Sequence, residues 1–246
     1  MELITVGSWA PYPRNNEACC GYILQEGMTT ILLDCGHAVF SNLGNYINCL
    51  QLDAVFISHF HPDHCADLHA LRHFMRGAFI SGQRSQPLKV FLPDDFEGDL
   101  TYWQQIKELD IVIVQDGWSF RLAELELKFY RMRHSILTYG VKIQSDQASF
   151  FYTADTRVEE SLIEASRGVD LLLAETTFRS YEKDLAAAAG HMTTADAAYW
   201  AKQAGAKKLL ATHFWPGFDL QELRNDLAGF YPGQFDLATA GIRVQI

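Results

Sequence analysis

The segment "SHFHPDHC", residues 58–65, places three histidines and an aspartate within six positions, namely His59, His61, Asp63 and His64. It follows "DAVFIS" (53–58), whose apolar run is typical of a strand buried on both faces. Side chains two apart on an extended chain point to the same side, so His59 and His61 face one point. Pro62 then helps to bend the chain, which lets Asp63 and His64 approach a second point. The segment therefore predicts a short loop that supplies ligands to two neighbouring metal ions.

The residue types of this loop suit particular metals. Neutral imidazole and carboxylate are good ligands for Zn²⁺ and are acceptable to Mn²⁺ or Fe²⁺. The alternative interpretation is a polar surface loop whose histidines have no shared role, which we would prefer for a single histidine. Four such residues within six positions at the end of a strand favour the metal site.

Length and composition predict an ordinary globular chain. Its 246 residues are 48% hydrophobic and 20% charged, without a linker or a low-complexity tract, so we expect a single domain over residues 1–246. No apolar run approaches the roughly 20 residues that span a bilayer, and the N-terminal segment "MELITVGSW" does not resemble a signal peptide. The five cysteines are odd in number and form no CxxC pair, which indicates a reducing compartment. We therefore expect a cytoplasmic protein that does not bind membranes.

Hydrophobic patterning predicts strands that alternate with helices, and hence a layered α/β architecture. Residues 122–129 alternate clearly, with Leu125, Leu127 and Phe129 on one face. Thr193 and Asp196 are spaced as in a capping box at the start of a helix, and Gly205 suits its end. Helices are expected over 66–79, near 97–109 and between the later strands. Strands are expected at 2–7, 20–26, 29–34, 53–58, 88–92, 110–115, 122–129, 149–153, 170–174 and 207–212.

Polar residues repeatedly follow the predicted buried strands. His59, Asp155, Glu175 and His213 each follow an apolar run closely. Open α/β sheets place their ligand sites at this end of their strands. We therefore expect these four side chains to converge on one edge of the structure.

The spacing H-x-H-x-D-H resembles that of the metallo-β-lactamase superfamily, and the resemblance extends over most of the chain. "LLDCG" (32–36), which contains Asp34, is similar to an early strand and turn of that superfamily. "RHSILTYG" (133–140) supplies His134, "YTADT" (152–156) supplies Asp155 and "ATHF" (211–214) supplies His213. The fold implied by the resemblance is a four-layer αββα sandwich.

The resemblance also implies how two divalent cations would be held, with Zn²⁺ expected first and Mn²⁺ or Fe²⁺ as alternatives. One metal would take His59, His61 and His134, the other would take Asp63, His64 and His213, and Asp155 would lie between them. His61 distinguishes the chain from the oxygen-reducing di-iron branch, which usually has Glu there. No cysteine stands at a ligand position, unlike in the Zn-dependent β-lactamases.

Two further segments, "AETTF" (174–178) and "GHMTTADA" (190–197), resemble short motifs of the ribonuclease Z branch. By this resemblance Glu175 orients His191, and His191 donates a proton to the leaving oxygen. Two close metals lower the pKa of a bound water towards ~7, and Asp63 can orient the resulting hydroxide or accept its proton. The alternative for His191 is a helix-entry residue bonded to a backbone carbonyl.

The ribonuclease Z branch carries a long arm between the third histidine and the bridging aspartate, but here only residues 135–154 separate His134 from Asp155. The net charge of −10 does not replace that arm, because phosphate backbones are bound by clustered Lys and Arg. No large nucleic acid is therefore expected as a partner.

The favoured function is a dinuclear phosphodiesterase that acts through a metal-bound hydroxide on a small-molecule substrate, such as a cyclic nucleotide, a cyclic phosphate or a short oligonucleotide. The alternatives are a lactonase or other carboxylic-ester hydrolase, and a metal-binding sensor or scaffold without turnover. The protein could also form a homodimer, which the sequence does not decide.

Overall fold

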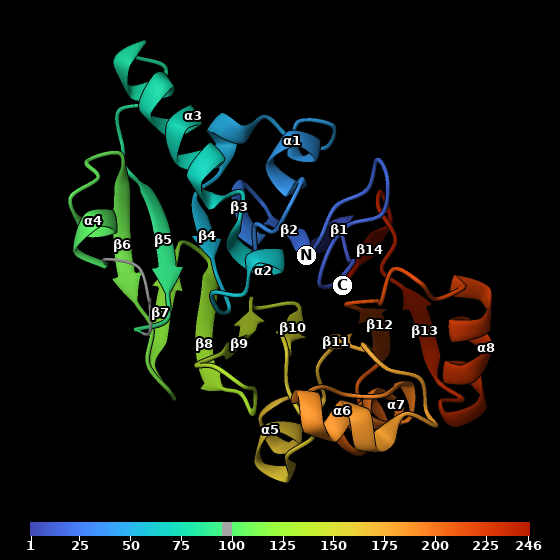
Figure 1. The fold of residues 1–246 in the computed structure, drawn as a ribbon. Helices are drawn as coiled ribbons and strands as arrows, with labels where there is room; N and C mark the ends of the chain where they lie inside the picture. Colours follow the sequence, from blue (N-terminus) through green and yellow to red (C-terminus); the bar gives the residue numbers. More distant parts are fainter. Residues whose placement is uncertain (95–99) are drawn as a thin grey trace.

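Two seven-stranded sheets pack face to face at the centre of the structure, a computed structural model that describes residues 1–94 and 100–246 (Figure 1). In sheet order, the first contains β14 (Arg243–Gln245), β1 (Glu2–Gly7), β2 (Gly21–Glu26), β3 (Thr29–Leu33), β4 (Ala54–Phe56), β5 (Leu88–Leu92) and β6 (Leu109–Ile113). The second contains β13 (Gln234–Leu237), β12 (Lys208–Thr212), β11 (Leu171–Glu175), β10 (Ser149–Tyr152), β9 (Tyr139–Gln144), β8 (Leu125–Arg131) and β7 (Ser119–Leu122).

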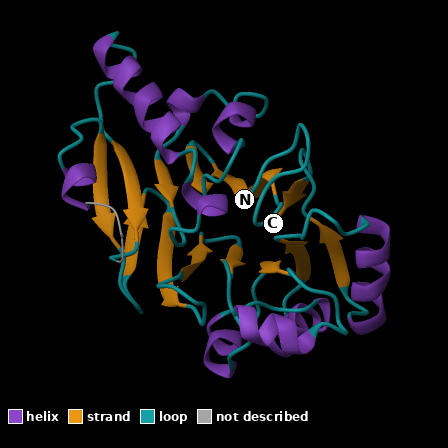
Figure 2. Ribbon diagram, viewed as in Figure 1, coloured by secondary structure: helices purple, strands orange, loops and turns teal. Residues whose placement is uncertain are grey.

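Helices cover the outer faces of both sheets, so that the strands lie between two helical layers (Figure 2). On the side of the first sheet lie α1 (Val39–Leu43), the 3₁₀ helix η1 (Cys49–Gln51), α3 (Leu68–Ile80) and α4 (Leu100–Gln104). The short α2 (Pro62–Cys65) lies near the middle of the molecule (Figure 1). On the side of the second sheet lie α5 (Glu160–Ala165), α6 (Lys183–Ala189), α7 (Thr194–Ala204) and α8 (Leu220–Phe230). The predicted four-layer αββα sandwich is confirmed.

Three apolar clusters hold these layers together. The largest lies between the sheets and contains Leu125, Leu127 and Phe129, the residues whose alternation predicts a half-buried strand. A second cluster joins α5, α7 and α8 to the outer face of the second sheet, and a third joins α1, α3 and α4 to the first sheet. Burying a single large apolar side chain contributes about 1.5–3 kcal/mol, so each interface stabilises the layers substantially.

Two predicted elements differ from the structure. The strand expected at 122–129 is divided between β7 and β8, because Ala123 takes a left-handed φ of 51° in the turn that joins them. The helix expected near 97–109 is shorter: α4 spans Leu100–Gln104, and Leu109 already pairs with Leu88 in a parallel ladder. The first part of that expected helix, 97–99, lies outside the described residues.

The start and the end of α7 agree with the sequence. The Thr193 hydroxyl accepts a hydrogen bond from the backbone N–H of Asp196, and the Asp196 side chain accepts one from the Thr193 N–H. Gly205 caps the other end with a left-handed φ of 63°, which glycine adopts at little cost. The predicted capping box is confirmed, and it fixes where the chain leaves the site and enters the helix.

The topology brings the ends of several strands to one edge. In the second sheet β10, β11 and β12 run parallel, so the residues that follow them meet at the same end. In the first sheet β3 and β4 also run parallel, and Asp34 and His59 follow them. Among the described residues no helix is both long and apolar enough to cross a bilayer.

Candidate metal centre

Three imidazoles and one carboxylate oxygen face a common point on the β4 side. The His61 Nδ1 lies 3.1 Å from the His59 Nε2 and 3.2 Å from the His134 Nε2. The Asp155 Oδ2 lies 3.4 Å from the His59 Nε2 and 3.8 Å from the His134 Nε2. Ligands about 2.0–2.1 Å from a tetrahedral zinc lie roughly 3.3 Å apart, so these separations suit one such ion.

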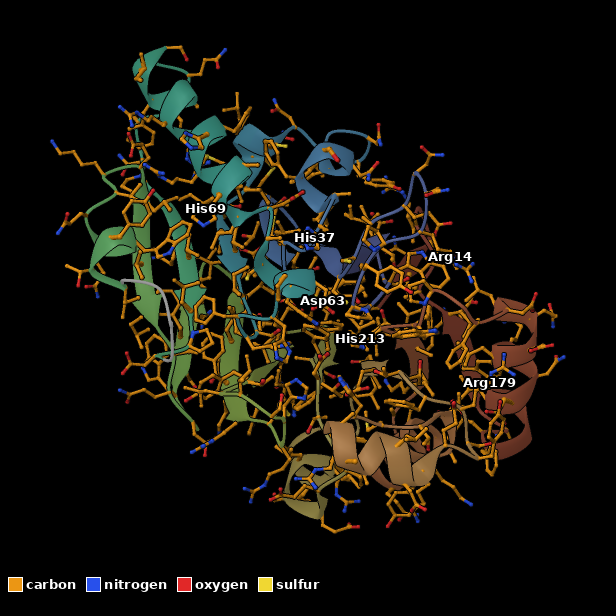
Figure 3. The ribbon with its side chains drawn as sticks, viewed as in Figure 1. Arg14, His37, Asp63, His69, Arg179 and His213 are labelled. Carbon is orange, nitrogen blue, oxygen red and sulfur yellow. The ribbon has the colours of Figure 1, made fainter. Side chains whose placement is uncertain are left out.

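A second point is faced by His64, His213 and two carboxylates. The Nε2 atoms of His64 and His213 lie 3.2 Å apart. The Asp63 Oδ2 lies 3.7 Å from the first and 3.4 Å from the second, and Figure 3 shows Asp63 and His213 close together at the centre of the molecule. The Asp155 Oδ1 lies 3.4 Å from the His64 Nε2 and 3.1 Å from the His213 Nε2.

Asp155 joins these two points through its two oxygens. Its carboxylate is buried, and Oδ1 has no hydrogen-bond donor among the described residues although two ring nitrogens lie close to it. A buried carboxylate oxygen without a donor is costly unless a cation completes its surroundings. The donor set therefore fits a pair of metal ions that share Asp155.

Protonation in the first group suits metal binding. Burial is the largest influence on the pKa values of His59, His61 and His134 and lowers all three. These imidazoles are therefore neutral at pH 7, which is the form that donates a lone pair to a metal. Burial raises the pKa of Asp155, but the neighbouring imidazoles of His213 and His64 outweigh burial and hold that pKa well below its usual value.

Each ring that presents Nε2 to the centre is held through its Nδ1. The Nδ1 of His59 contacts the Ser58 hydroxyl at 3.0 Å, and the Nδ1 of His64 contacts Asp34 at 2.8 Å. The Nδ1 of His134 donates to the Gly190 carbonyl at 3.0 Å, and the Nδ1 of His213 contacts the Thr177 hydroxyl at 2.7 Å. Such partners fix the tautomer and the orientation of a metal-binding histidine.

Asp34 connects one ligand to the core of the protein. Its carboxylate accepts hydrogen bonds from the Ser58 N–H at 2.7 Å, the Ser58 hydroxyl at 2.9 Å and the Tyr152 hydroxyl at 2.6 Å, in addition to His64. The sequence indicates Asp34 only as part of a motif and gives it no role. The available signal is a charged residue at the end of an apolar strand, where burial demands several partners.

The backbone around the centre takes conformations that are uncommon for these residue types. Asp34, Ala154 and His213 have left-handed φ values of 59°, 49° and 63°. Such residues persist where the surrounding structure holds them, and they are common at functional sites. Each lies directly after a strand or beside a ligand, so the turns redirect the chain to aim the ligands inward.

His191 and Glu175 form a pair beside the ligands. The His191 Nδ1 lies 2.9 Å from the Glu175 Oε1, and its ring stacks on that of His213 with centroids 5.2 Å apart. Glu175 also accepts from the Thr156 N–H, the Thr177 hydroxyl and the Met192 N–H. A carboxylate, and not a backbone carbonyl, therefore holds the His191 ring. Burial lowers the pKa of His191, but Glu175 outweighs burial and the net shift is upward.

The sequence also gives no role to Cys20. Its sulfur lies within 4.8 Å of ring nitrogens of both His64 and His213. Burial raises the pKa of the thiol well above its ordinary value, so the sulfur is protonated. A cavity of about 420 Å³ lies beside the centre, and His61, Asp63, Asp155, His191 and His213 are among the residues that line it.

Comparisons with known proteins agree with this geometry. Residues 29–214, which contain all seven proposed ligands, match the family described as "Beta-lactamase superfamily domain". The chain is 32% identical to the "Probable metallo-hydrolase YhfI" of Bacillus subtilis over 98% of both chains. The crystal structure of YhfI superposes with a TM-score of 0.92 at 29% identity, covering 99% of this chain and 98% of that one. The "Ribonuclease Z" of Ignicoccus hospitalis is 26% identical over 87% of each chain. The chain therefore belongs to the metallo-β-lactamase superfamily, in its ribonuclease Z-like branch of metallo-hydrolases.

Proposed function

We propose that the protein is a dinuclear metal-dependent phosphodiesterase that acts on a small phosphodiester. The observation that carries the proposal is the His191–Glu175 pair, whose histidine lies against His134 and His213, one ligand of each proposed metal position, and lines the cavity. A metal centre alone serves many hydrolases. A buried carboxylate that holds a histidine beside it adds a proton donor for a poor leaving group such as an alkoxide.

We assign the seven ligands to two ions on the basis of the distances between their atoms. His59, His61 and His134 would hold one ion, Asp63, His64 and His213 the other, and Asp155 both. When bound, two divalent cations, with Zn²⁺ first, would activate a water at neutral pH and neutralise charge on a phosphoryl oxygen. The Asp63 carboxylate lies at the cavity wall, where it can orient that water or accept its proton.

His191 would supply the proton for the leaving oxygen. Its Nδ1 is held by Glu175, so Nε2 is the nitrogen that remains for a substrate in the cavity. The raised pKa favours a protonated ring near neutral pH. Thr177 links this pair to the metal centre, because its hydroxyl donates to Glu175 and contacts the Nδ1 of His213. The donor and the metal ligand are therefore positioned by one hydrogen-bonded unit.

The connection between His134 and Asp155 supports a small substrate. It consists of β9 and β10, which pair as an antiparallel hairpin, and no extended arm occurs between them. The relatives include ribonucleases Z, yet this chain offers no arm there to hold a tRNA body. The net charge of −10 also disfavours a long nucleic-acid contact surface. We also propose that the protein works in a reducing compartment such as the cytoplasm, because its five cysteines are odd in number and include no CxxC pair.

A carboxylic-ester hydrolase is the second candidate, because part of the cavity wall is apolar and would also accept an acyl lactone. The test is to load the purified protein with Zn²⁺ or Mn²⁺ and to measure turnover of bis(p-nitrophenyl) phosphate and of an acyl lactone side by side. Phosphodiester turnover that a chelator abolishes supports the proposal. Lactone turnover with an inert phosphodiester contradicts it, and inactivity on both with bound metal supports a sensor or scaffold.

A further inference from the structure

The cavity beside the metal centre has two chemically different walls. Metal ligands and His191 form one wall. The rest of the lining forms a wall that is apolar apart from Thr177 and consists otherwise of Ala10, Pro11, Pro62, Phe178, Ala189 and Trp215. Among the described residues no Lys or Arg lines this cavity, although a phosphodiesterase substrate is an anion. A group that enters beyond the metals is therefore met by apolar and aromatic surface, and a second negative charge there would lack a partner.

Trp215 provides a flat aromatic surface at the mouth of the cavity. Its side chain is 42% exposed, and Tyr12, 50% exposed, meets it edge-on with ring centroids 5.7 Å apart. Trp215 comes two residues after the ligand His213, so a group stacked on the indole stays close to a phosphate at the second metal point. Exposed aromatic side chains on a ligand-binding surface are the usual stacking partners of nucleobases.

Two of the segments that contribute to this wall, 8–11 and 213–216, are fixed to each other. The Phe214 N–H donates to the Ser8 carbonyl at 2.8 Å, and the Ala10 N–H donates to the Phe214 carbonyl at 3.0 Å. Arg14, labelled in Figure 3, donates from Nε to the Pro216 carbonyl at 2.8 Å and from a guanidinium nitrogen to the Phe218 carbonyl. A surface held in place before binding loses little entropy when a ligand arrives.

The indole also lies against Gly217. A Cβ at that position would come within 2.9 Å of the indole Nε1, so any side chain there must displace the ring. The cavity volume of about 420 Å³ is near the lower end of the roughly 300–1,000 Å³ found for small-molecule sites. The space suits one mononucleotide-sized group and not a folded nucleic acid.

We propose that Trp215 selects the substrate: the phosphodiester carries an uncharged planar ring of the nucleobase type that stacks on Trp215, and no second phosphate enters this cavity. This inference rests on the proposed phosphodiesterase function and names its substrate class. Arg131, Arg133 and Arg157 line another cavity together with the ligand His134, and this cavity shares no lining residue with the first. Those arginines therefore do not supply a charge partner within the cavity.

The experiment compares two substrates with the same leaving group. One is the p-nitrophenyl ester of thymidine 5′-monophosphate, and the other is methyl p-nitrophenyl phosphate, which lacks the base and sugar. The wild-type protein should prefer the thymidine ester. Trp215→Ala should lower kcat/KM for the thymidine ester at least about tenfold more than for the methyl ester, mainly through KM, because base stacking contributes roughly 5- to 150-fold. Trp215→Phe, which keeps a ring, should recover most of the preference.

Controls and a binding measurement complete the test. Gly217→Ala should act in the same direction as Trp215→Ala, whereas Phe230→Ala, an aromatic residue 50% exposed and outside the cavity lining, should leave both substrates unchanged. Calorimetric titration with thymidine 5′-monophosphate should show weaker binding to Trp215→Ala than to the wild type.

The outcomes separate the two proposals. Equal losses on both substrates in Trp215→Ala, or a wild type without preference for the thymidine ester, would overturn the role of Trp215. Trp215-dependent binding of thymidine 5′-monophosphate by a protein that hydrolyses neither ester would support the aromatic site and contradict the phosphodiesterase.

Discussion

The Nδ1 of His191 lies 2.9 Å from the Oε1 of Glu175. His191 lies in the short segment between α6 and α7, whereas Glu175 is the last residue of β11. Glu175 is 1% exposed and its oxygens are fully hydrogen-bonded, so its position is fixed independently of any ligand. The pair therefore forms a rigid unit that holds an imidazole over the cavity.

Asp155→Ala should remove the group that both metal points share. Because each oxygen of Asp155 faces a different set of imidazoles, we expect the loss to affect both ions and not one. Elemental analysis of the purified protein should give about two metal ions per chain for the wild type and fewer than one for the variant. Asp146→Ala, an exposed turn residue, is the matched control and should keep both ions. Full occupancy in Asp155→Ala would show that the carboxylate does not bridge.

Asp34→Ala should weaken metal binding without removing a ligand. The substitution frees the Nδ1 of His64 and leaves the buried Tyr152 hydroxyl without its acceptor. Loss of such an outer partner typically costs about 10- to 100-fold in metal affinity. Competition against a chromogenic chelator would measure the change. An affinity equal to that of the wild type would mean that the ring of His64 is oriented by something other than Asp34.

Gly36→Ala should distort the approach of the early turn to the metal loop. A Cβ at Gly36 would lie 1.8 Å from the backbone carbonyl oxygen of Asp63, so the backbone of one segment must move. We expect a loss of about 1–3 kcal/mol or more in the free energy of unfolding, together with weaker metal binding at the second point. Thermal unfolding would detect it. Gly44→Ala, where a Cβ would meet nothing within 4 Å, should unfold near the wild-type temperature, and similar behaviour of both variants would refute the close approach.

Full-length precursor tRNA should be a poor substrate despite the ribonuclease Z-like centre. The β9–β10 hairpin stands where that branch carries its arm, and the chain has a net charge of −10. A 3′-processing assay at physiological salt should show little trimming at enzyme concentrations that hydrolyse a small phosphodiester readily. Efficient trimming under those conditions would mean that another surface holds the tRNA.

The sequence predicts the ligands better than it predicts what holds them. His59, Asp155, Glu175 and His213 follow apolar runs, and parallel strand ends meet at one edge, so their convergence follows from patterning. Asp34, Thr177 and Cys20 lie beside ligands that are distant from them in the chain, and spacing cannot indicate such contacts. The sequence also does not predict the turn at Ala123, because a left-handed alanine has no sequence signal of the kind that glycine gives. The sequence likewise does not predict that the rings of Tyr12 and Trp215 lie against each other, because these residues are far apart in the chain.

The central claim is that His191 donates a proton to the leaving oxygen, and its dependence on the leaving group tests this most directly. His191→Ala should lower hydrolysis of an alkyl phosphodiester by ~10² or more, the usual scale of general acid catalysis. A p-nitrophenyl diester should be affected far less, because its phenolate leaves without a proton. Metal content should stay at the wild-type value, since His191 is not among the proposed ligands. Equal losses on both substrates, or a loss of metal from the variant, would contradict the account and remove the role assigned to Glu175 as well.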